Sequence, residues 1–226
     1  MKTLTAPASQ TSCYTNRRFE STKLSNGGGI NRILIVTGDG GESYEALYAI
    51  HRLEEEGWKG VIAAPSRRRL KLVMHDFTPG WDTYVERRGY GVTSELTFDD
   101  VRVEDYAAVL ILGGRAPEYL RDDDKVLEIV KQFDCDGKWV FAICHGIQVL
   151  AAAGLIRGKR VTCYTHVRRE AEQAGAMFVD EQTVCDGRIV TAQTWQSHPS
   201  FYREIVARLS GNARSEIFLT KAQTLE

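Results

Sequence analysis

The stretch WVFAICHGIQVLAAA, from Trp139 to Ala153, decides the fold. It opens with the apolar run 139–143, whose branched and aromatic side chains are typical of a buried strand. A helical stretch follows almost at once, with only Cys144 at the junction. A strand that turns directly into a helix at a nucleophilic residue indicates a nucleophile elbow on an α/β sheet. Small residues at Ala142 and Gly146 suit such a tight turn, because a larger side chain there would crowd it.

Strands and helices alternate on both sides of this stretch. Short apolar runs predict strands at 32–37, 60–64, 107–112 and 139–143, and within 158–165. Helical spacing predicts helices at 42–56, 123–133, 144–153 and 200–209, and the pair Asp186-Gly187 predicts a hairpin over 184–190. This alternation predicts an α/β three-layer sandwich of the flavodoxin-like kind, with a mostly parallel central sheet. Its site should lie at the carboxyl ends of the strands.

Composition excludes several classes of protein. The 226 residues are 43% hydrophobic and 26% charged, with a formal net charge of −1. A near-neutral chain is not a strongly basic nucleic-acid binder or a polybasic membrane-surface protein. No apolar run approaches the roughly 20 residues of a membrane-spanning helix. We therefore expect neither nucleic acid nor membrane as a partner.

The cysteines indicate free thiols. They are odd in number, far apart, and show no metal-ligand spacing: Cys13, Cys135, Cys144, Cys163 and Cys185. No hydrophobic signal segment is visible. Together these features predict a reducing, cytoplasmic location without disulfides. They also predict no metal site.

The two ends of the chain differ from its centre. Residues 1–29 are rich in Ser, Thr, Asn and Gly and show no regular period. We interpret them as a flexible arm or leader, with a transit peptide or an arm on a neighbouring subunit as alternatives. Residues 211–226 are interpreted as a short tail. One α/β domain is expected over 30–210.

Three features at predicted strand ends carry chemistry. A cysteine at a helix N-terminus should have a lowered pKa, so Cys144 is the candidate nucleophile, although a buried structural cysteine is the alternative. Gly113 and Gly114 follow another strand, and their N–H groups, with that of His145, are expected to hold an oxyanion unless they form an ordinary turn. Glu45 follows the first strand near Glu42; the alternative is that both are favourable helix N-terminal acids.

These residues resemble the ThiJ/PfpI superfamily, whose fold is that of the class I glutamine amidotransferases. The resemblance rests on 142–146, on 113–118, and on Glu45 before Ala46-Leu47-Tyr48, and it extends from Arg32 to Leu209. It is specific for the superfamily and not for the reaction, since members include glyoxalases, deglycases, peptidases, chaperone-like proteins and hydratases.

The resemblance implies a role for each matching residue. Cys144 would be the nucleophile and His145 its proton-transfer partner. Glu45 would hydrogen-bond the sulfur and works best when protonated, because two adjacent negative charges raise both pKa values. Glu118 would come from a neighbouring subunit to orient the histidine, which implies a homo-oligomer of the dimer or hexamer type. His145 is expected to leave the elbow in another direction than Cys144, and therefore to need such steering.

One stretch departs from the intracellular protease branch of the superfamily. In this chain the segment 66–90 is longer than the short hairpin of that branch, and it includes His75, Trp81 and Tyr84. We expect this insertion to wall a substrate pocket; the alternative is a surface hairpin. His198, before the last predicted helix, is either a further pocket residue or a solvated cap.

Two classes of function compete. The first is a cysteine enzyme without cofactor or metal, acting on small reactive carbonyls such as methylglyoxal, on their adducts, or on peptides. The second is a redox sensor or chaperone-like stress protein that uses oxidation of Cys144. A sensor has little use for a steered histidine, so His145 and Glu118 favour the enzyme.

Overall fold

The computed structural model describes residues 30–211. Its central sheet has seven strands in the order β10-β11-β7-β6-β1-β2-β5, and only β10 is antiparallel to its neighbour. The strands, in sheet order, are β10 (Thr183–Asp186), β11 (Ile189–Ala192), β7 (Trp139–Ile143), β6 (Ala108–Ile111), β1 (Arg32–Val36), β2 (Lys59–Ala64) and β5 (Leu96–Thr97). The fold is thus the expected α/β sandwich with a mostly parallel sheet.

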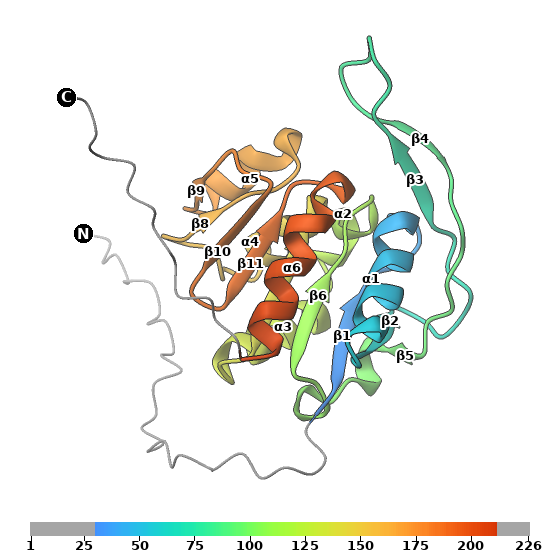
Figure 1. Ribbon diagram of the computed structural model, residues 1–226, viewed down its shortest axis with the longest axis vertical. Coiled ribbons are helices and arrows are strands. Elements are labelled where there is room, and N and C mark those ends of the chain that lie inside the picture. Colours follow the sequence, from blue (N-terminus) through green and yellow to red (C-terminus); the bar gives the residue numbers. More distant parts are fainter. Residues whose placement is uncertain (1–29, 212–226) are drawn as a thin grey trace, which may run out of the picture.

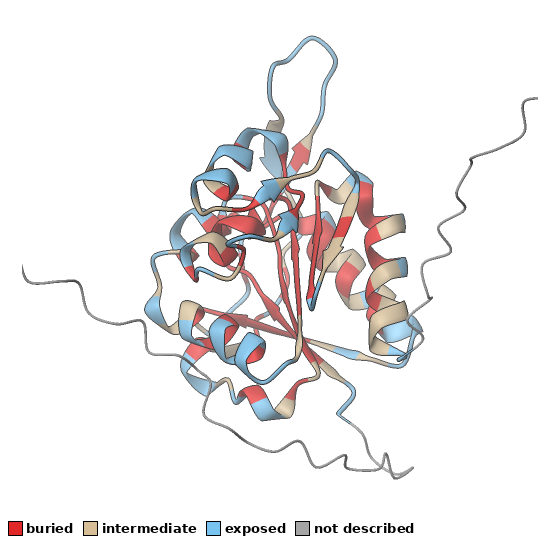
Figure 2. Cartoon of the chain, turned by 90° about the vertical axis from the view of Figure 1, so that its left-hand side faces the viewer, coloured by how far each residue is buried: buried red, intermediate tan, exposed pale blue. Residues whose placement is uncertain are grey.

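Helices cover both faces of this sheet (Figure 1). They are α1 (Ser43–Glu55), α2 (Ala116–Leu120), α3 (Asp124–Cys135), α4 (Ile147–Ala152), α5 (Arg168–Gln173) and α6 (His198–Leu209). Figure 1 shows α1 and α6 on the near face, with α3 behind. The central strands between the layers are buried along nearly their whole length, as Figure 2 shows, because both faces are covered.

Local sequence signals explain where the longer helices begin. The side chain of Glu42 accepts the backbone N–H of Tyr44 and caps α1. Asp123 caps α3 in the same way, accepting the N–H groups of Lys125 and Val126. Burial of the apolar face of each helix against the sheet then supplies most of its stability.

The register of the sheet brings three strand ends together. Val36, the last residue of β1, pairs with Ile111 of β6, and Ile111 pairs with Ala142 of β7. The residues that follow these strands therefore meet at one edge of the sheet. These segments contain Glu45, Gly113 and Cys144, as the sequence predicted.

The insertion at 66–90 forms a separate antiparallel hairpin of β3 (Val73–Asp76) and β4 (Val85–Arg88). Figure 1 places it beside the carboxyl ends of the sheet strands, with its tip reaching beyond them. A second small sheet pairs β8 (Arg160–Val161) with β9 (Met177–Phe178). The sequence reading missed the short elements β5, β9, α2 and α5, which lack enough residues to show a period.

Two segments that were interpreted from the sequence lie outside the described residues: the arm at 1–29 and, beyond residue 211, the tail. Within 30–211, no helix is long and apolar enough to cross a membrane.

Candidate functional site

Cys144 stands at a strained turn. It directly follows β7 and has a φ of 58°, and it is the one non-glycine residue of the described chain in the left-handed region. The 3₁₀ turn Cys144–Gly146 leads into α4. A Cβ on Gly146 would lie 2.6 Å from the carbonyl oxygen of Ile111, so the tight turn requires glycine there. Backbone strain of this kind gathers at functional sites.

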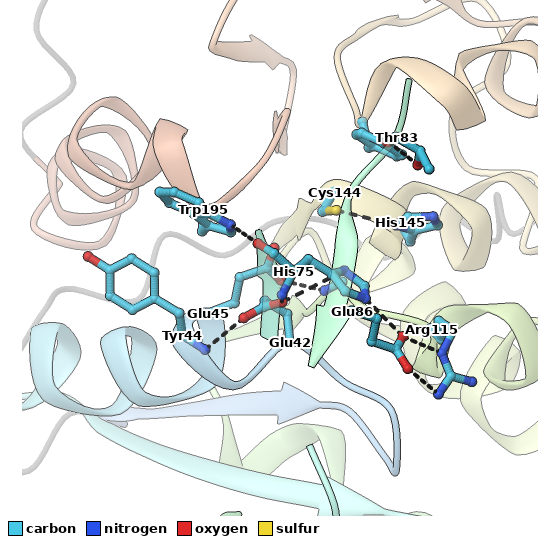
Figure 3. Close-up of polar contacts among 12 residues, drawn as sticks. Glu42, Tyr44, Glu45, His75, Thr83, Glu86, Arg115, Cys144, His145 and Trp195 are labelled. Atoms are coloured by element: carbon cyan, nitrogen blue, oxygen red, sulfur yellow. Dashed lines mark hydrogen bonds and ion pairs between the residues drawn. The ribbon is translucent and has the colours of Figure 1, made fainter. Parts of the chain in front are cut away.

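The side chain of His145 faces the sulfur. Its Nδ1 lies 3.3 Å from Sγ of Cys144, as Figure 3 shows. The expectation that this histidine leaves the elbow in another direction was wrong, because the 3₁₀ turn lets adjacent side chains bend together. The thiol therefore has its own proton acceptor within the chain.

Glu45 lies buried beside this pair. Its Oε2 accepts the backbone N–H of Gly113 at 2.6 Å, whereas its Oε1 has no hydrogen-bond partner among the described residues. Burial, followed by the negative charge of Glu42, raises the pKa of Glu45 well above its usual value. The carboxyl is therefore held in its protonated form, as the sequence reading expected.

The expected oxyanion donors need correction. The N–H of Gly113 is already bound to Glu45, so it is not free to hold an oxyanion. The backbone N–H groups of His145 and Gly114 instead point to the sulfur and oppose the rise of its pKa. Gly114 adopts a φ of 73°, and a Cβ there would lie 2.4 Å from the backbone nitrogen of Glu42. Two donors of the expected three thus remain beside Cys144.

The predicted low pKa of Cys144 was wrong for this chain. Burial, followed by the charge of Glu45, raises the pKa of the thiol well above its usual value. The cysteine is only 6% exposed. The helix that follows it, α4, has only six residues, so its dipole is weak. Loss of hydration therefore raises the pKa of the thiol more than the helix N-terminus lowers it.

His145 is neutral in this environment. Burial, followed by the charges of His75 and His166, lowers the pKa of His145 to about 4. No carboxylate of the described residues hydrogen-bonds to it. Glu118, on α2, is exposed, and its side chain forms no hydrogen bond or ion pair with another described residue. The acid that the resemblance assigns to this histidine is thus on the surface of the single chain.

Glu42 has a structural role. Its carboxylate caps α1 and also accepts the backbone N–H of His75 at 2.8 Å. Burial raises the pKa of Glu42 to about 7. Of the two acids noted at this helix start, one is a cap and the other faces the nucleophile.

The insertion brings two of its three noted residues to the site. The ring of His75 is buried and stacks on Tyr84 at a centroid distance of 3.8 Å. Tyr84 in turn lies 6.0 Å from the ring of His145. Trp81 lies in the loop between β3 and β4, where it is 64% exposed. Tyr84 therefore lies beside His145 and His75 lies behind Tyr84, while Trp81 lies on the hairpin surface.

His198 is buried, so it is not a solvated cap. Its ring stacks on Tyr48 of α1 at 4.4 Å, and both of its nitrogens lack a partner among the described residues. Burial lowers the pKa of His198 to about 4. It is the first residue of α6, and its ring packs against Tyr44 and Tyr48 of α1.

Sequence reasoning gave no role to three residues near the site, which are Glu86, Arg115 and Tyr164. Glu86 pairs with His75 and with Arg115, and Tyr164 lies 5.1 Å from the ring of His145. Figure 3 shows the Glu86–Arg115 pair beside His75. Glu86 lies opposite His75 in the register of the hairpin. The sequence would have placed it there only if the pairing of the two hairpin strands had been known.

Among residues 30–211, no three His, Cys, Asp or Glu side chains gather as metal ligands.

Comparison with known proteins identifies relatives along most of the chain. Protein DJ-1 homolog D of Arabidopsis thaliana is 38% identical over 186 residues, which are 79% of this chain and 48% of the relative. The chain thus spans about half the length of that protein. Deglycase PfpI of Pyrococcus furiosus is 34% identical over 178 residues, covering 79% of this chain and 99% of the relative. Relatives with such names place enzymatic activity in this group of proteins.

Solved structures show the same fold. A two-domain protein of Anabaena variabilis, with dj-1/thij/pfpi-like and ferritin-like domains, has a TM-score of 0.72 at 25% identity. The match covers 81% of this chain and 49% of that one. A ThiJ/PfpI domain protein of Brachyspira murdochii has a TM-score of 0.71 at 23% identity, over 81% and 99% of the two chains. A model of the DJ-1/PfpI family matches residues 31–208, and the chain belongs to that family.

Proposed function

We propose that this chain is a cysteine enzyme that acts, without a cofactor, on small reactive carbonyls or on their adducts. The contact that carries the proposal is the 3.3 Å approach of Sγ of Cys144 to Nδ1 of His145. A thiol beside a proton acceptor, at a strained turn, is what covalent catalysis by cysteine requires. The deglycase names of several relatives agree with this class of substrate.

The protonation states determine how the first step runs. With the thiol pKa raised and the pKa of His145 lowered to about 4, both groups are neutral at rest. Proton transfer from Sγ to Nδ1 therefore accompanies attack on the carbonyl carbon instead of preceding it. The S–C bond forms as the C=O π bond breaks, and the oxygen becomes an alkoxide. In this proposal the N–H groups of His145 and Gly114, which lie beside the sulfur, stabilise that alkoxide.

For a 2-oxoaldehyde the remaining steps balance without an oxidant. The alkoxide takes the proton held by His145 and becomes a hemithioacetal. The hydrogen of its carbinol carbon then moves as a proton to the neighbouring carbonyl carbon, while the hydroxyl proton moves to the oxygen of that carbonyl. That rearrangement gives the thioester of a 2-hydroxy acid. Water hydrolyses the thioester, which releases the acid and returns the proton to Sγ. The net reaction is addition of one water molecule. In this proposal protonated Glu45, which is buried beside the thiol, shares the proton of the sulfur.

A substrate panel tests this function. Methylglyoxal, glyoxal, a glycated amino acid and a fluorogenic peptide are offered to the parent protein and to Cys144→Ala. Cys185→Ala is the matched control, since that half-buried thiol lies on β10 away from the elbow. We expect carbonyl turnover in the parent and the control, and none in Cys144→Ala. A folded parent protein that turns over no carbonyl substrate would overturn the proposal, and turnover of the peptide alone would assign a peptidase.

A redox sensor is the second candidate. The two backbone N–H groups beside Cys144 would also stabilise an oxidised sulfur. A sensor does not need the proton acceptor, so His145→Ala separates the two functions. In an enzyme this variant loses turnover, whereas in a sensor it is still oxidised by peroxide and still changes its binding partner.

We also propose that Glu118 acts in a homo-oligomer. His145 has no carboxylate partner among the described residues, and Glu118 is exposed on α2 near the same edge of the sheet. A carboxylate supplied by a second copy of the chain would favour the charged imidazole that forms during attack.

A further inference from the structure

The β3–β4 hairpin is fixed over the site by contacts to separate segments. At its base, Glu42 accepts the backbone N–H of His75 at 2.8 Å, and Nε1 of Trp195 donates to the carbonyl of His75 at 2.9 Å. At its outer end, the hydroxyls of Thr83 and Tyr164 lie 3.1 Å apart. These contacts link the hairpin to α1 and to segments that follow β8 and β11 (Figure 3). The hairpin is therefore part of the site and not a loose surface loop.

Tyr84 is the hairpin residue whose ring lies against His145, the neighbour of the nucleophile. Its ring stacks on His75 at an interplanar angle of 18° and lies edge-on to His145 at 77°. Burial, followed by the charge of Cys144, raises the pKa of Tyr84 to about 12. The phenol is therefore a protonated hydrogen-bond donor at neutral pH, within electrostatic range of the sulfur.

Glu86 connects this stack to the turn that follows β6. Its Oε2 lies 3.1 Å from Nε2 of His75, directly across the hairpin. Its two carboxylate oxygens also accept from Arg115, at 2.5 Å from Nε and 2.9 Å from Nη2. Arg115 directly follows Gly114, and its own N–H donates to the carbonyl of Gly40 at 2.7 Å. Glu86 thus joins the ring under Tyr84 to the segment that carries a backbone donor of the site.

An alkoxide formed at this site can accept a further hydrogen bond besides those from the backbone. Because Glu45 takes the N–H of Gly113, the backbone supplies only the N–H groups of His145 and Gly114 beside the sulfur. A carbonyl oxygen has two lone pairs and becomes an alkoxide on attack, so a preorganised neutral donor stabilises the transition state strongly.

We propose that Tyr84 donates its hydroxyl to the carbonyl oxygen of the substrate attacked by Cys144, and that Glu86 is the residue that positions Tyr84 through His75. This proposal rests on the proposed function and assigns a further donor to the same site. Glu86 touches no substrate; it acts by holding the His75 ring between itself and the phenol.

Kinetics of single and double variants test both parts of the proposal, the donor role of Tyr84 and the positioning role of Glu86. Tyr84→Phe keeps the stacked ring and removes only the hydroxyl. We expect it to lower kcat/KM for methylglyoxal about 100- to 1,000-fold, mainly through kcat, as loss of one oxyanion donor does. Glu86→Gln should lose part of that factor. In the Tyr84→Phe background, Glu86→Gln should have no further effect, because the hydroxyl it positions is gone.

Two controls separate positioning from folding. Arg87→Gln breaks the 3.5 Å pair of Arg87 with Asp76 on the same hairpin without touching His75, and should leave kcat/KM unchanged. Alkylation of Cys144 by iodoacetamide forms no alkoxide at the carbon attacked by sulfur, so its rate should stay within about twofold of the parent in Tyr84→Phe. Unchanged kcat/KM in Tyr84→Phe would overturn the donor assignment. Fully additive losses in the double variant would overturn the positioning role.

Tyrosinate absorbance tests the positioning role without any substrate. The difference between the parent and Tyr84→Phe isolates the titration of Tyr84, and the same difference in the Glu86→Gln background isolates it without the Glu86 contact. We expect little ionisation of Tyr84 up to about pH 11 in the parent, and a lower pKa of Tyr84 after Glu86→Gln, because the variant both loosens the buried stack and removes a negative charge that raises this pKa. Identical curves would overturn the role of Glu86. If the parent turns over no carbonyl, the donor assignment falls with the proposed function, while identical titration curves would still overturn the positioning role of Glu86.

Discussion

Gly113 donates its backbone N–H to Oε2 of Glu45 at 2.6 Å, and the space where its side chain would lie is shared by that oxygen and the thiol. A Cβ on Gly113 would lie 3.0 Å from Oε2 of Glu45 and 3.1 Å from Sγ of Cys144. The carboxyl and the sulfur therefore converge over a single glycine. This closeness is why the carboxyl must hold a proton, since an ionised pair would repel in a buried place.

Gly113→Ala should abolish activity more than it harms folding. The added methyl would lie 2.5 Å from Cβ of Cys144, so either the elbow or Glu45 must move. We expect a stability loss of about 1–3 kcal/mol, as for other overpacked cores, and at least about a tenfold loss of turnover per folded molecule. Urea unfolding and steady-state kinetics on the same samples measure both.

Gly158→Ala is the control for that substitution. Gly158 has a φ of 73° and open space around it, so alanine there strains the backbone without touching the site. It should lose stability and keep its turnover. Equal turnover per folded molecule in both variants would contradict the arrangement over Gly113.

Glu45→Gln should stabilise the protein increasingly as the pH rises. Burial raises the pKa of Glu45 in the folded state above its ordinary 4.5. Between these two values the unfolded chain releases the proton and the folded chain keeps it, so the free energy of unfolding falls with pH in the parent. The slope for one such group is at most about 1.4 kcal/mol per pH unit. Glutamine does not titrate, so its variant lacks this slope.

Urea unfolding of the parent and Glu45→Gln at several pH values above 4.5 measures the difference. Glu42, whose pKa is raised to about 7, contributes a slope of the same sign in both proteins, and it largely cancels in the comparison. Parallel stability curves would mean that Glu45 is ionised in the folded protein. The proton assignment would then be wrong.

Glu45→Gln should also lower the pKa of Cys144. At the high pH where the thiol titrates, Glu45 has already lost its own proton, and that negative charge is the second cause, after burial, that raises the pKa of Cys144. Glutamine carries no charge at any pH and keeps the side-chain shape. Glu45→Asp retracts the carboxyl by one methylene and should lengthen its bond to Gly113. Ultraviolet absorbance of the thiolate against pH, with the other cysteines substituted, measures the three titrations. If the curves superimpose and turnover is unchanged, Glu45 is only an acid near a helix start.

The sheet and the nucleophile could be predicted because their signals are local. The run at 139–143 is apolar throughout, since both faces of β7 are covered, and its end marks Cys144. Parallel strands place the residues after them at one edge, so Glu45 and Gly113 could be placed beside it.

The remainder of the site depends on contacts that sequence spacing does not encode. Glu86 is exposed on β4, and its role follows from the register that sets it opposite His75. The use of the Gly113 N–H by Glu45 depends on how far one carboxyl reaches across a buried gap. The raised pKa of Cys144 reflects burial, which a motif at a helix start does not reveal.

Glu118 provides the test of a shared site. Neither Glu118→Ala nor Cys144→Ala should be active alone, because each homo-oligomer would lack one of the two groups at every site. Mixed under conditions of subunit exchange, the two inactive proteins should form hybrids in which some sites combine an intact Glu118 with an intact Cys144. The physical reason is that His145 has no carboxylate partner among residues 30–211, so a carboxylate from a second copy of the chain would stabilise its charged form. The matched control mixes His145→Ala with Cys144→Ala, whose lesions lie on one elbow and should not complement. Recovery is read as methylglyoxal turnover, and exchange is followed by native mass spectrometry of differently tagged chains. No recovery despite demonstrated exchange would mean that Glu118 serves its own chain or has no catalytic role.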